Sequence, residues 1–162
     1  MFLKRITPLL LSLLLLTGCG KNNRASRAMT IADELGILES TLLTLEDSHG
    51  GFHGDGDTFV CFQAPEFQPG EDWQEFPLPE NLSIALYGGM IGDMQWGSLL
   101  TDDSGEPRMT AVENGYYYFR DRHSKSTDET DPSALLDRSS FNFTLAVYDA
   151  DSEMVYYFEK DT

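Results

Sequence analysis

The sequence predicts an α+β domain with an antiparallel sheet of about five strands and two or three short helices. Three observations lead to this class. Segments with strand-like alternation of apolar and polar residues recur along the chain and dominate its C-terminal third, and short helical patterns lie between them. No period of 20 to 50 residues repeats, which argues against a repeat architecture.

The first predicted elements are a short helix and two strands. "TIADEL" has Thr30 as a possible helix cap and Gly36 as the stop. "TLLTLEDS" alternates, with Leu43 and Leu45 on one side, and "TFVCFQ" is rich in aromatic and β-branched residues. We expect these two strands to form one antiparallel hairpin.

The turn of this hairpin is predicted at Asp55-Gly56, a pair that favours a two-residue type I′ loop. Such a turn places His53 opposite Thr58 and Phe52 opposite Phe59. Leu43 and Leu45 would then lie on the opposite face of the first strand from Phe52, because the first two are odd-numbered and Phe52 is even-numbered. A bulge of one extra residue at Gly50-Gly51 would bring them onto the same face.

In the middle of the chain "PENLSIALYG" is typical of a short helix. Pro79 suits its start, Gly88 suits its stop, and Leu82, Ala85 and Leu86 fall on one side. We interpret three nearby aromatic residues as packing residues, with an aromatic ligand platform as the alternative; they are Trp73, Phe76 and Trp96.

The C-terminal third predicts strands at 116–122, 141–149 and 154–160. The second strand alternates most clearly, and we expect one half-buried face, formed by Phe141, Phe143, Leu145 and Val147. "DADS" at 149–152 suits a tight hairpin. An exposed loop is expected around 121–133, followed by one or two helical turns with Asp131 as cap.

The N-terminus has the pattern of a secretion signal. Lys4 and Arg5 precede a mostly apolar run at 6–16, about half of the roughly 20 residues that span a bilayer. The residues Leu16-Thr17-Gly18-Cys19 at its end match a lipobox, and the segment resembles the signal of a bacterial lipoprotein. The resemblance implies cleavage before Cys19, a diacylglycerol on its sulfur and, in many bacteria, an acyl chain such as palmitate on the new amino terminus. An ordinary signal peptide is the alternative.

Cleavage before Cys19 divides the chain into a signal peptide (1–18), a polar tether (19–28) and a single α+β domain (29–162). The mature part keeps 9 of the 11 Lys and Arg residues and all 27 Asp and Glu residues, a net charge of −18. This balance argues against nucleic acid as a partner and favours a basic protein or peptide. Three tether residues could contact anionic lipid headgroups, or the tether could simply be soluble; they are Lys21, Arg24 and Arg27.

Residues 48–57, "SHGGFHGDGD", form the one segment that suggests metal chemistry. His49, His53, Asp55 and Asp57 are all competent ligands for zinc or a similar ion. The glycines disfavour a helix here, and on a straight strand the two histidines would lie about 13 Å apart. We therefore predict that they do not converge and that no metal or other cofactor binds, and we keep these four residues as weak candidates.

No pattern in the sequence assembles a nucleophile. Cys61 has no basic neighbour in sequence and is interpreted as a small buried hydrophobe. The chain also lacks a G-x-S-x-G elbow and a phosphate-binding glycine loop.

Three blocks occur in order, "HGGFHGDGDTFV", "ENGYYYFRDRH" and "NFTLAVYDADSEMVYYFEKD". From about Leu35 to the end the chain resembles a group of small exported or lipid-anchored bacterial proteins of unassigned function. That resemblance implies a common α+β domain and no particular chemistry. We therefore expect a lipid-anchored protein on the extracytoplasmic face of a cell membrane, with a non-catalytic binding or envelope-associated function. The alternative is a metal-dependent enzyme or metal-binding protein that uses His49, His53 and Asp55.

Overall fold

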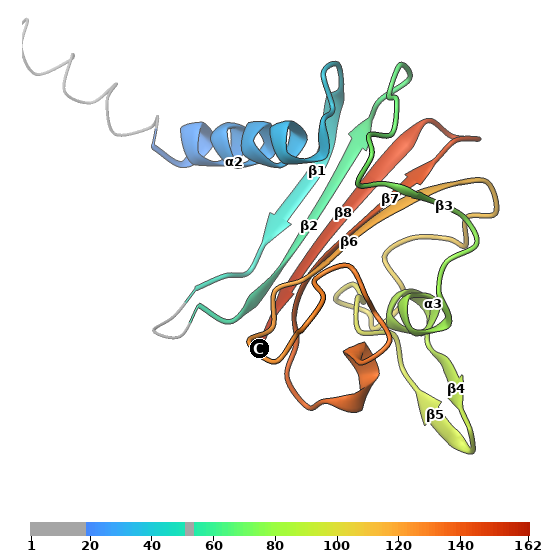
Figure 1. Cartoon of the computed structure of the whole chain (residues 1–162). Coiled ribbons are helices and arrows are strands. Elements are labelled where there is room, and N and C mark those ends of the chain that lie inside the picture. The colour runs from blue at the N-terminus through green and yellow to red at the C-terminus, as the bar shows by residue number, and fades with distance from the viewer. Residues whose placement is uncertain (1–18, 51–53) are drawn as a thin grey trace, which may run out of the picture. The chain divides into compact units, whose positions relative to one another are not determined.

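A computed structural model describes residues 19–50 and 54–162 (Figure 1). The chain divides into two compact units, Met1–Gly36 and Ile37–Thr162. The described part of the first unit is α2 (Cys19–Leu35) and the glycine that follows it.

Helix α2 begins well before the predicted start at Thr30. Thr30 lies inside the helix, where its hydroxyl donates to the carbonyl of Ser26 at 3.0 Å, so its assignment as a cap was wrong. The segment expected to be a polar tether is helical: it contains no proline, and its lysine, arginine and alanine residues favour a helix. The predicted stop is confirmed: Gly36 has a φ of 72°, and its N–H donates to the carbonyl of Asp33.

The second unit is built on a six-stranded antiparallel sheet with the strand order β1-β2-β8-β7-β6-β3. A separate two-stranded sheet, β4 with β5, follows the helix α3 in the chain. The α+β class is thereby confirmed. The strands are β1 (Thr41–Asp47), β2 (Gly56–Gln63), β3 (Gln74–Glu75), β4 (Gly89–Ile91), β5 (Met94–Trp96), β6 (Gly115–Asp121), β7 (Asn142–Asp149) and β8 (Met154–Asp161).

The β1–β2 hairpin is confirmed, but its predicted turn and register were wrong. Gly56 belongs to β2 and pairs with Asp161 of β8, while Thr58 lies opposite Asp47 instead of His53. Strand β2 extends this far because β8 pairs with it over its whole length. The chain therefore reverses between 48 and 56, and residues 51–53 with His53 lie outside the described residues.

The bulge in this hairpin lies in β1, where the register shifts between Leu42 and Thr44. Leu43 is therefore unpaired and 51% exposed, whereas Leu45 is buried. The two leucines, predicted to lie on one side of the strand, therefore differ in burial. Gly51, half of the predicted bulge, is outside the described residues.

The three C-terminal strands were predicted correctly, and β7 and β8 form the expected hairpin with Asp149 opposite Met154. The expected half-burial of β7 was wrong, because Thr144, Ala146 and Tyr148 on its second face are also buried. A central strand covered on both faces loses the polar face of a half-buried one. Part of the cover comes from Phe67, whose ring lies 5.0 Å from that of Tyr148.

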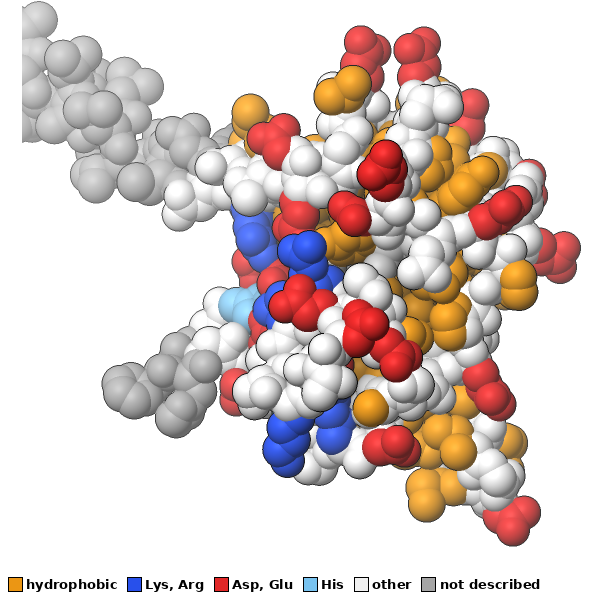
Figure 2. Space-filling model, in the orientation of Figure 1, with side chains coloured by type: hydrophobic (Ala, Val, Ile, Leu, Met, Phe, Trp, Pro, Cys, Tyr) orange, Lys and Arg blue, Asp and Glu red, His pale blue; other side chains and the backbone are white. Residues whose placement is uncertain are grey.

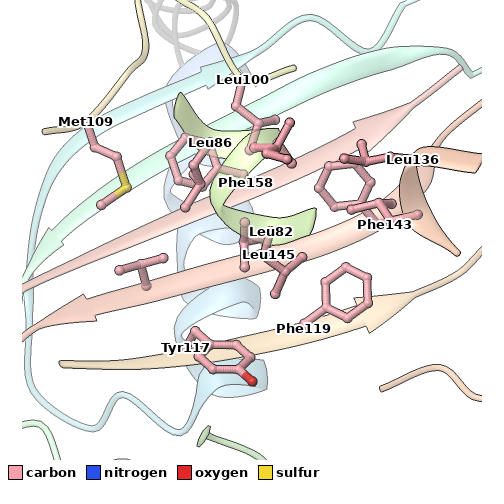
Figure 3. Packing of buried hydrophobic residues seen from close by; sticks show 14 residues of the cluster. Leu82, Leu86, Leu100, Met109, Tyr117, Phe119, Leu136, Phe143, Leu145 and Phe158 are labelled. Atoms are coloured by element: carbon pink, nitrogen blue, oxygen red, sulfur yellow. The ribbon is translucent and has the colours of Figure 1, made fainter. Parts of the chain in front are cut away.

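The helix α3 (Glu80–Tyr87) covers the other face of the sheet. Its predicted limits are confirmed, with Pro79 before it and Gly88, at a φ of 74°, after it. Figure 3 shows Leu82 and Leu86 of α3 packed over side chains of the sheet, among them Leu145 and Phe158. The expected turns after Asp131 reduce to one 3₁₀ turn, η1 (Leu135–Asp137), which adds Leu135 and Leu136 to this core.

The three aromatic residues interpreted as packing residues do pack. Trp73 is buried, with its ring 5.1 Å from that of Phe67, and Phe76 and Trp96 lie against the core under α3.

Candidate functional site

Charged side chains gather at one end of the large sheet, where β1, β6 and β8 end and β2 and β7 begin. We call this region the charged end. It places residues far apart in sequence side by side, because antiparallel strands alternate in direction. Ion pairs at this end include His49–Asp47, His49–Asp161, Arg122–Glu159, Arg122–Asp161, Lys160–Asp57 and Arg138–Asp121.

His49 lies between two carboxylates. Its Nδ1 is 2.8 Å from Asp47 and 3.1 Å from the hydroxyl of Thr58, and its Nε2 is 3.1 Å from Asp161. Burial lowers the pKa of His49, but the hydrogen bonds to Asp47 and Asp161 outweigh it, so the pKa is raised above 6.5. The ring therefore joins the end of β1 to the end of β8, and the two carboxylates favour its protonated form.

Gly56 makes room for this histidine. A Cβ at Gly56 would lie 2.6 Å from both the Cα and the backbone nitrogen of His49. The close approach therefore requires glycine at the first position of β2.

The predicted metal candidates do not form a ligand set in the described residues. Both ring nitrogens of His49 contact carboxylates, the Asp57 carboxylate accepts from the Lys160 ammonium at 3.0 and 3.2 Å, and Asp55 is exposed. Across residues 19–50 and 54–162 no group of three His, Cys, Asp or Glu residues is placed to hold a metal ion. Because His53 is not described, the predicted separation of the two histidines stays a prediction.

Beside these ion pairs, a pocket of about 280 Å³ opens between the strand ends and the segment that follows β5. Phe59, Phe158 and Leu100 give it apolar walls, and acidic side chains border it. We call it the acidic pocket. Its lining residues are Glu46, Asp47, Ser48, Asp57, Thr58, Phe59, Leu100, Thr101, Asp103, Arg108 and Phe158.

The acidic pocket already holds one cation of the chain itself. The guanidinium of Arg108 lies 5.1 Å from the centre of the Phe59 ring and pairs with Glu46. The buried Phe158 ring lies 5.1 Å from that of Phe59 and supports it from the core. A cation over an aromatic face beside a carboxylate is a favourable arrangement, and more so when water is partly excluded. The Arg108 side chain is only 17% exposed.

The carboxylates of the acidic pocket outnumber its cations. Glu46, Asp47 and Asp57 each have a cationic partner, whereas Asp103 is exposed and has no ion pair within the described part of the chain. The side chain of Glu46 is 54% exposed, so one side of this carboxylate stays open to solvent. The pocket therefore keeps solvent-exposed negative charge on Asp103 and on one side of Glu46.

A buried ion pair fixes the loop after β6. Both terminal nitrogens of Arg138 donate to Asp121, at 2.7 and 2.8 Å, and the Asp121 side chain is 3% exposed. Burial raises the pKa of Asp121, but Arg138 and the N–H of His123 lower it further, so the net direction is downward. This pair is structural, since it closes the loop of residues 122–137 onto the sheet.

Cys61 is buried, as predicted. Burial raises its pKa from 9.0 to about 11, so the thiol stays protonated near neutral pH. Cys19, the predicted lipidation site, is the first residue of α2.

Most of the acidic pocket was not anticipated from the sequence. Arg108, Phe59, Phe158 and Asp103 carry no local motif, and they meet only through strand pairing and the loop after β5. The excess of acidic residues was the one signal that indicated the character of such a site.

No helix within the described residues combines the length and the apolar character needed to cross a bilayer. Comparison with protein-family models, with characterised proteins and with solved structures gave no match for this chain.

Proposed function

We propose that this chain is a lipid-anchored extracytoplasmic protein that binds a basic protein or peptide, without catalysis, at the acidic pocket. The observation that carries the proposal is the guanidinium of Arg108 over Phe59 and against Glu46. The chain's own arginine shows that this surface accommodates a cationic group between an aromatic ring and a carboxylate.

The neighbouring carboxylates define what a ligand would meet. Asp103 and the exposed side of Glu46 supply negative charge, and the partly buried Phe59 supplies an aromatic face. A lysine or arginine side chain of a partner fits this combination, because its stem can lie against the Phe59 ring while its head pairs with a carboxylate.

The surface charge supports the same class of partner. Acidic side chains are spread over the face that Figure 2 displays. A net charge of −18, from 9 basic and 27 acidic residues after residue 18, accelerates the approach of a basic partner and disfavours acidic ones.

Binding can be tested with a fluorescent nona-arginine peptide and the protein from residue 20 onward. We expect Asp103→Asn/Glu46→Gln to weaken binding about fivefold or more, since two carboxylates of the pocket are neutralised. The control Glu66→Gln/Glu71→Gln removes the same charge beyond the opposite end of β2, and it should change affinity less than about twofold. Equal losses in both variants would show general charge attraction and reject the pocket.

The lipid anchor can be tested by detergent phase partitioning of the full-length protein. The native protein should enter the detergent phase, because two or three acyl chains anchor stably. Cys19→Ala should stay aqueous or remain an uncleaved precursor, and Cys61→Ala, which changes the buried cysteine, should behave like the native protein. Detergent partitioning of a processed Cys19→Ala protein would reject the anchor.

A further inference from the structure

The hairpin of β4 and β5 exposes large apolar side chains. Met90 is 50% exposed, Ile91 39% and Met94 62%. Figure 1 shows the hairpin extending away from the large sheet, and Figure 2 shows hydrophobic side chains gathered at the same place. We call these three residues the apolar tip. Exposed apolar clusters of this kind mark contact sites more often than isolated exposed leucines do.

The base of the hairpin is fixed to the core. Trp96 packs against the core under α3, and the hydroxyl of Ser98 donates to the carbonyl of Leu86 at 2.7 Å. The N–H of Leu99 donates to the carbonyl of Ala85 at 2.9 Å, and a Cβ at Gly88 would lie 2.9 Å from the carbonyl oxygen of Trp96. The apolar tip is therefore held out from an anchored base, which lowers the entropic cost of binding.

Charge indicates which kind of surface the apolar tip contacts. The turn of the hairpin contains Asp93, and residues 88–107 include four acidic residues and no lysine or arginine. An anionic bilayer surface repels such a segment. A second copy of the chain would bring like charges together. A protein surface that combines apolar side chains with lysine or arginine is complementary to the apolar tip and the acidic residues around it.

The apolar tip and the acidic pocket belong to one stretch of chain. Directly after β5, Leu100, Thr101 and Asp103 line the acidic pocket, and Arg108 completes it. The base of the hairpin therefore leads directly into the pocket wall, so the two surfaces are linked by a short segment of chain.

We infer that the apolar tip, Met90, Ile91 and Met94, is a second contact element for the basic partner, and that it binds apolar side chains which neighbour that partner's lysine or arginine residues. The inference rests on the proposed function, since it assigns the apolar half of the same interaction. Methionine suits the role because its flexible side chain adapts to different apolar surfaces.

The test compares two peptides on the protein from residue 20 onward: an amphipathic leucine–lysine peptide and nona-arginine. We expect Met90→Ser/Ile91→Ser/Met94→Ser to weaken binding of the leucine–lysine peptide about tenfold and to leave nona-arginine binding unchanged. The control Leu38→Ser/Leu42→Ser/Leu43→Ser replaces three exposed leucines outside the β4–β5 hairpin. It should leave both affinities unchanged.

Equal binding of the leucine–lysine peptide by the native protein and the tip variant would overturn the inference. An equal loss in the control variant would also overturn it. Failure of the proposed function is a separate outcome, seen as nona-arginine binding that ignores Asp103→Asn/Glu46→Gln.

Two further measurements address the other possible occupants of the tip. Light scattering that shows a dimer of the native protein and a monomer of the tip variant would assign the tip to a second copy. Sedimentation with vesicles of phosphatidylcholine and phosphatidylglycerol that depends on the tip would assign it to the bilayer. Either result would overturn the inference, whereas a native monomer that does not sediment would support it.

Discussion

The two ends of the six-stranded sheet are stabilised by different interactions. At the charged end, residues in or directly after β1, β2, β6 and β8 meet in ion pairs around His49, Arg122 and Lys160. At the opposite end, where β7 turns into β8, Phe67 packs edge-on against both Trp73 and Tyr148. We call this second region the aromatic end.

The contrast shows that the two ends should respond differently to solution conditions. Aromatic packing depends on contact area and varies little with pH or salt. Ion pairs depend on the protonation of both partners, and exposed ones are screened by salt. The acidic pocket lies at the charged end, so its surroundings should respond to pH and salt while the aromatic end does not.

The largest effect is expected at the charged end, from Asp121→Asn. The substitution leaves Arg138 without its countercharge, although its guanidinium is largely buried and its Nε already lacks a hydrogen-bond partner. Breaking a buried pair in this way costs about 3–5 kcal/mol of the free energy of unfolding. Urea denaturation followed by tryptophan fluorescence measures it.

The control for this substitution is Glu129→Gln. It breaks the exposed ion pair between Arg120 of β6 and Glu129 of the loop after β6. It should cost no more than about 1 kcal/mol. Similar losses for Asp121→Asn and Glu129→Gln would contradict the structural role of the buried pair.

At the aromatic end, Phe67→Ala should reduce the free energy of unfolding by about 3 kcal/mol, because it removes a buried ring and leaves a cavity. The loss should be the same at pH 6 and pH 8 and at low and high salt. A loss that changed with pH would show that the two ends are not independent.

A smaller effect is expected from placing alanine at a crowded glycine at each end. A Cβ at Gly115 would lie 1.9 Å from the carbonyl oxygen of Tyr148, and one at Gly56 would lie 2.6 Å from His49. Gly115→Ala should therefore cost more than Gly56→Ala, each within about 1–3 kcal/mol. Gly56→Ala should in addition shift the ring resonances of His49 in NMR spectra, and Gly115→Ala should leave them unchanged.

The smallest effect is a pH dependence from His49. Since its pKa is raised in the folded protein, protonated His49 adds stability that is complete below the unfolded pKa of about 6.5 and is lost as pH rises through the folded pKa. The difference in the free energy of unfolding between native protein and His49→Gln should therefore shrink from pH 6 to pH 8. His123→Gln is the control, because the described ring contacts of His123 are with Ser140 and the N–H of Lys125. A difference that grew with pH would contradict the two-carboxylate contact of His49.

The accuracy of the sequence predictions depended on how local the deciding interaction was. Helix α3 and the hairpin after Asp149 were predicted because proline, glycine and turn residues act on their immediate neighbours. The turn predicted at Asp55-Gly56 was wrong because Gly56 pairs with Asp161 of β8. Asp161 is far away in the sequence, so no local pattern indicates this pairing. The register of β1 likewise follows from a bulge that pairing with β2 decides.

The prediction of the site was limited in the same way, by contacts between residues far apart in sequence. His49 and Asp57 drew attention through their residue types, but their partners, Asp161 and Lys160, stand 112 and 103 residues away. Arg108 reaches Glu46 across 62 residues. No local pattern predicts such pairs, because strand order decides which side chains meet.

The sequence by itself determined the class of the fold, the position of most strands, the burial of Cys61 and the acidic character of the surface. These properties follow from composition, periodicity and turn chemistry, which act over a few residues. Tertiary structure decided which carboxylates are neutralised and which stay open, and that the guanidinium of Arg108 lies over Phe59. The reason is that β2 lies between β1 and β8, so residues from the two halves of the chain share one end of the sheet.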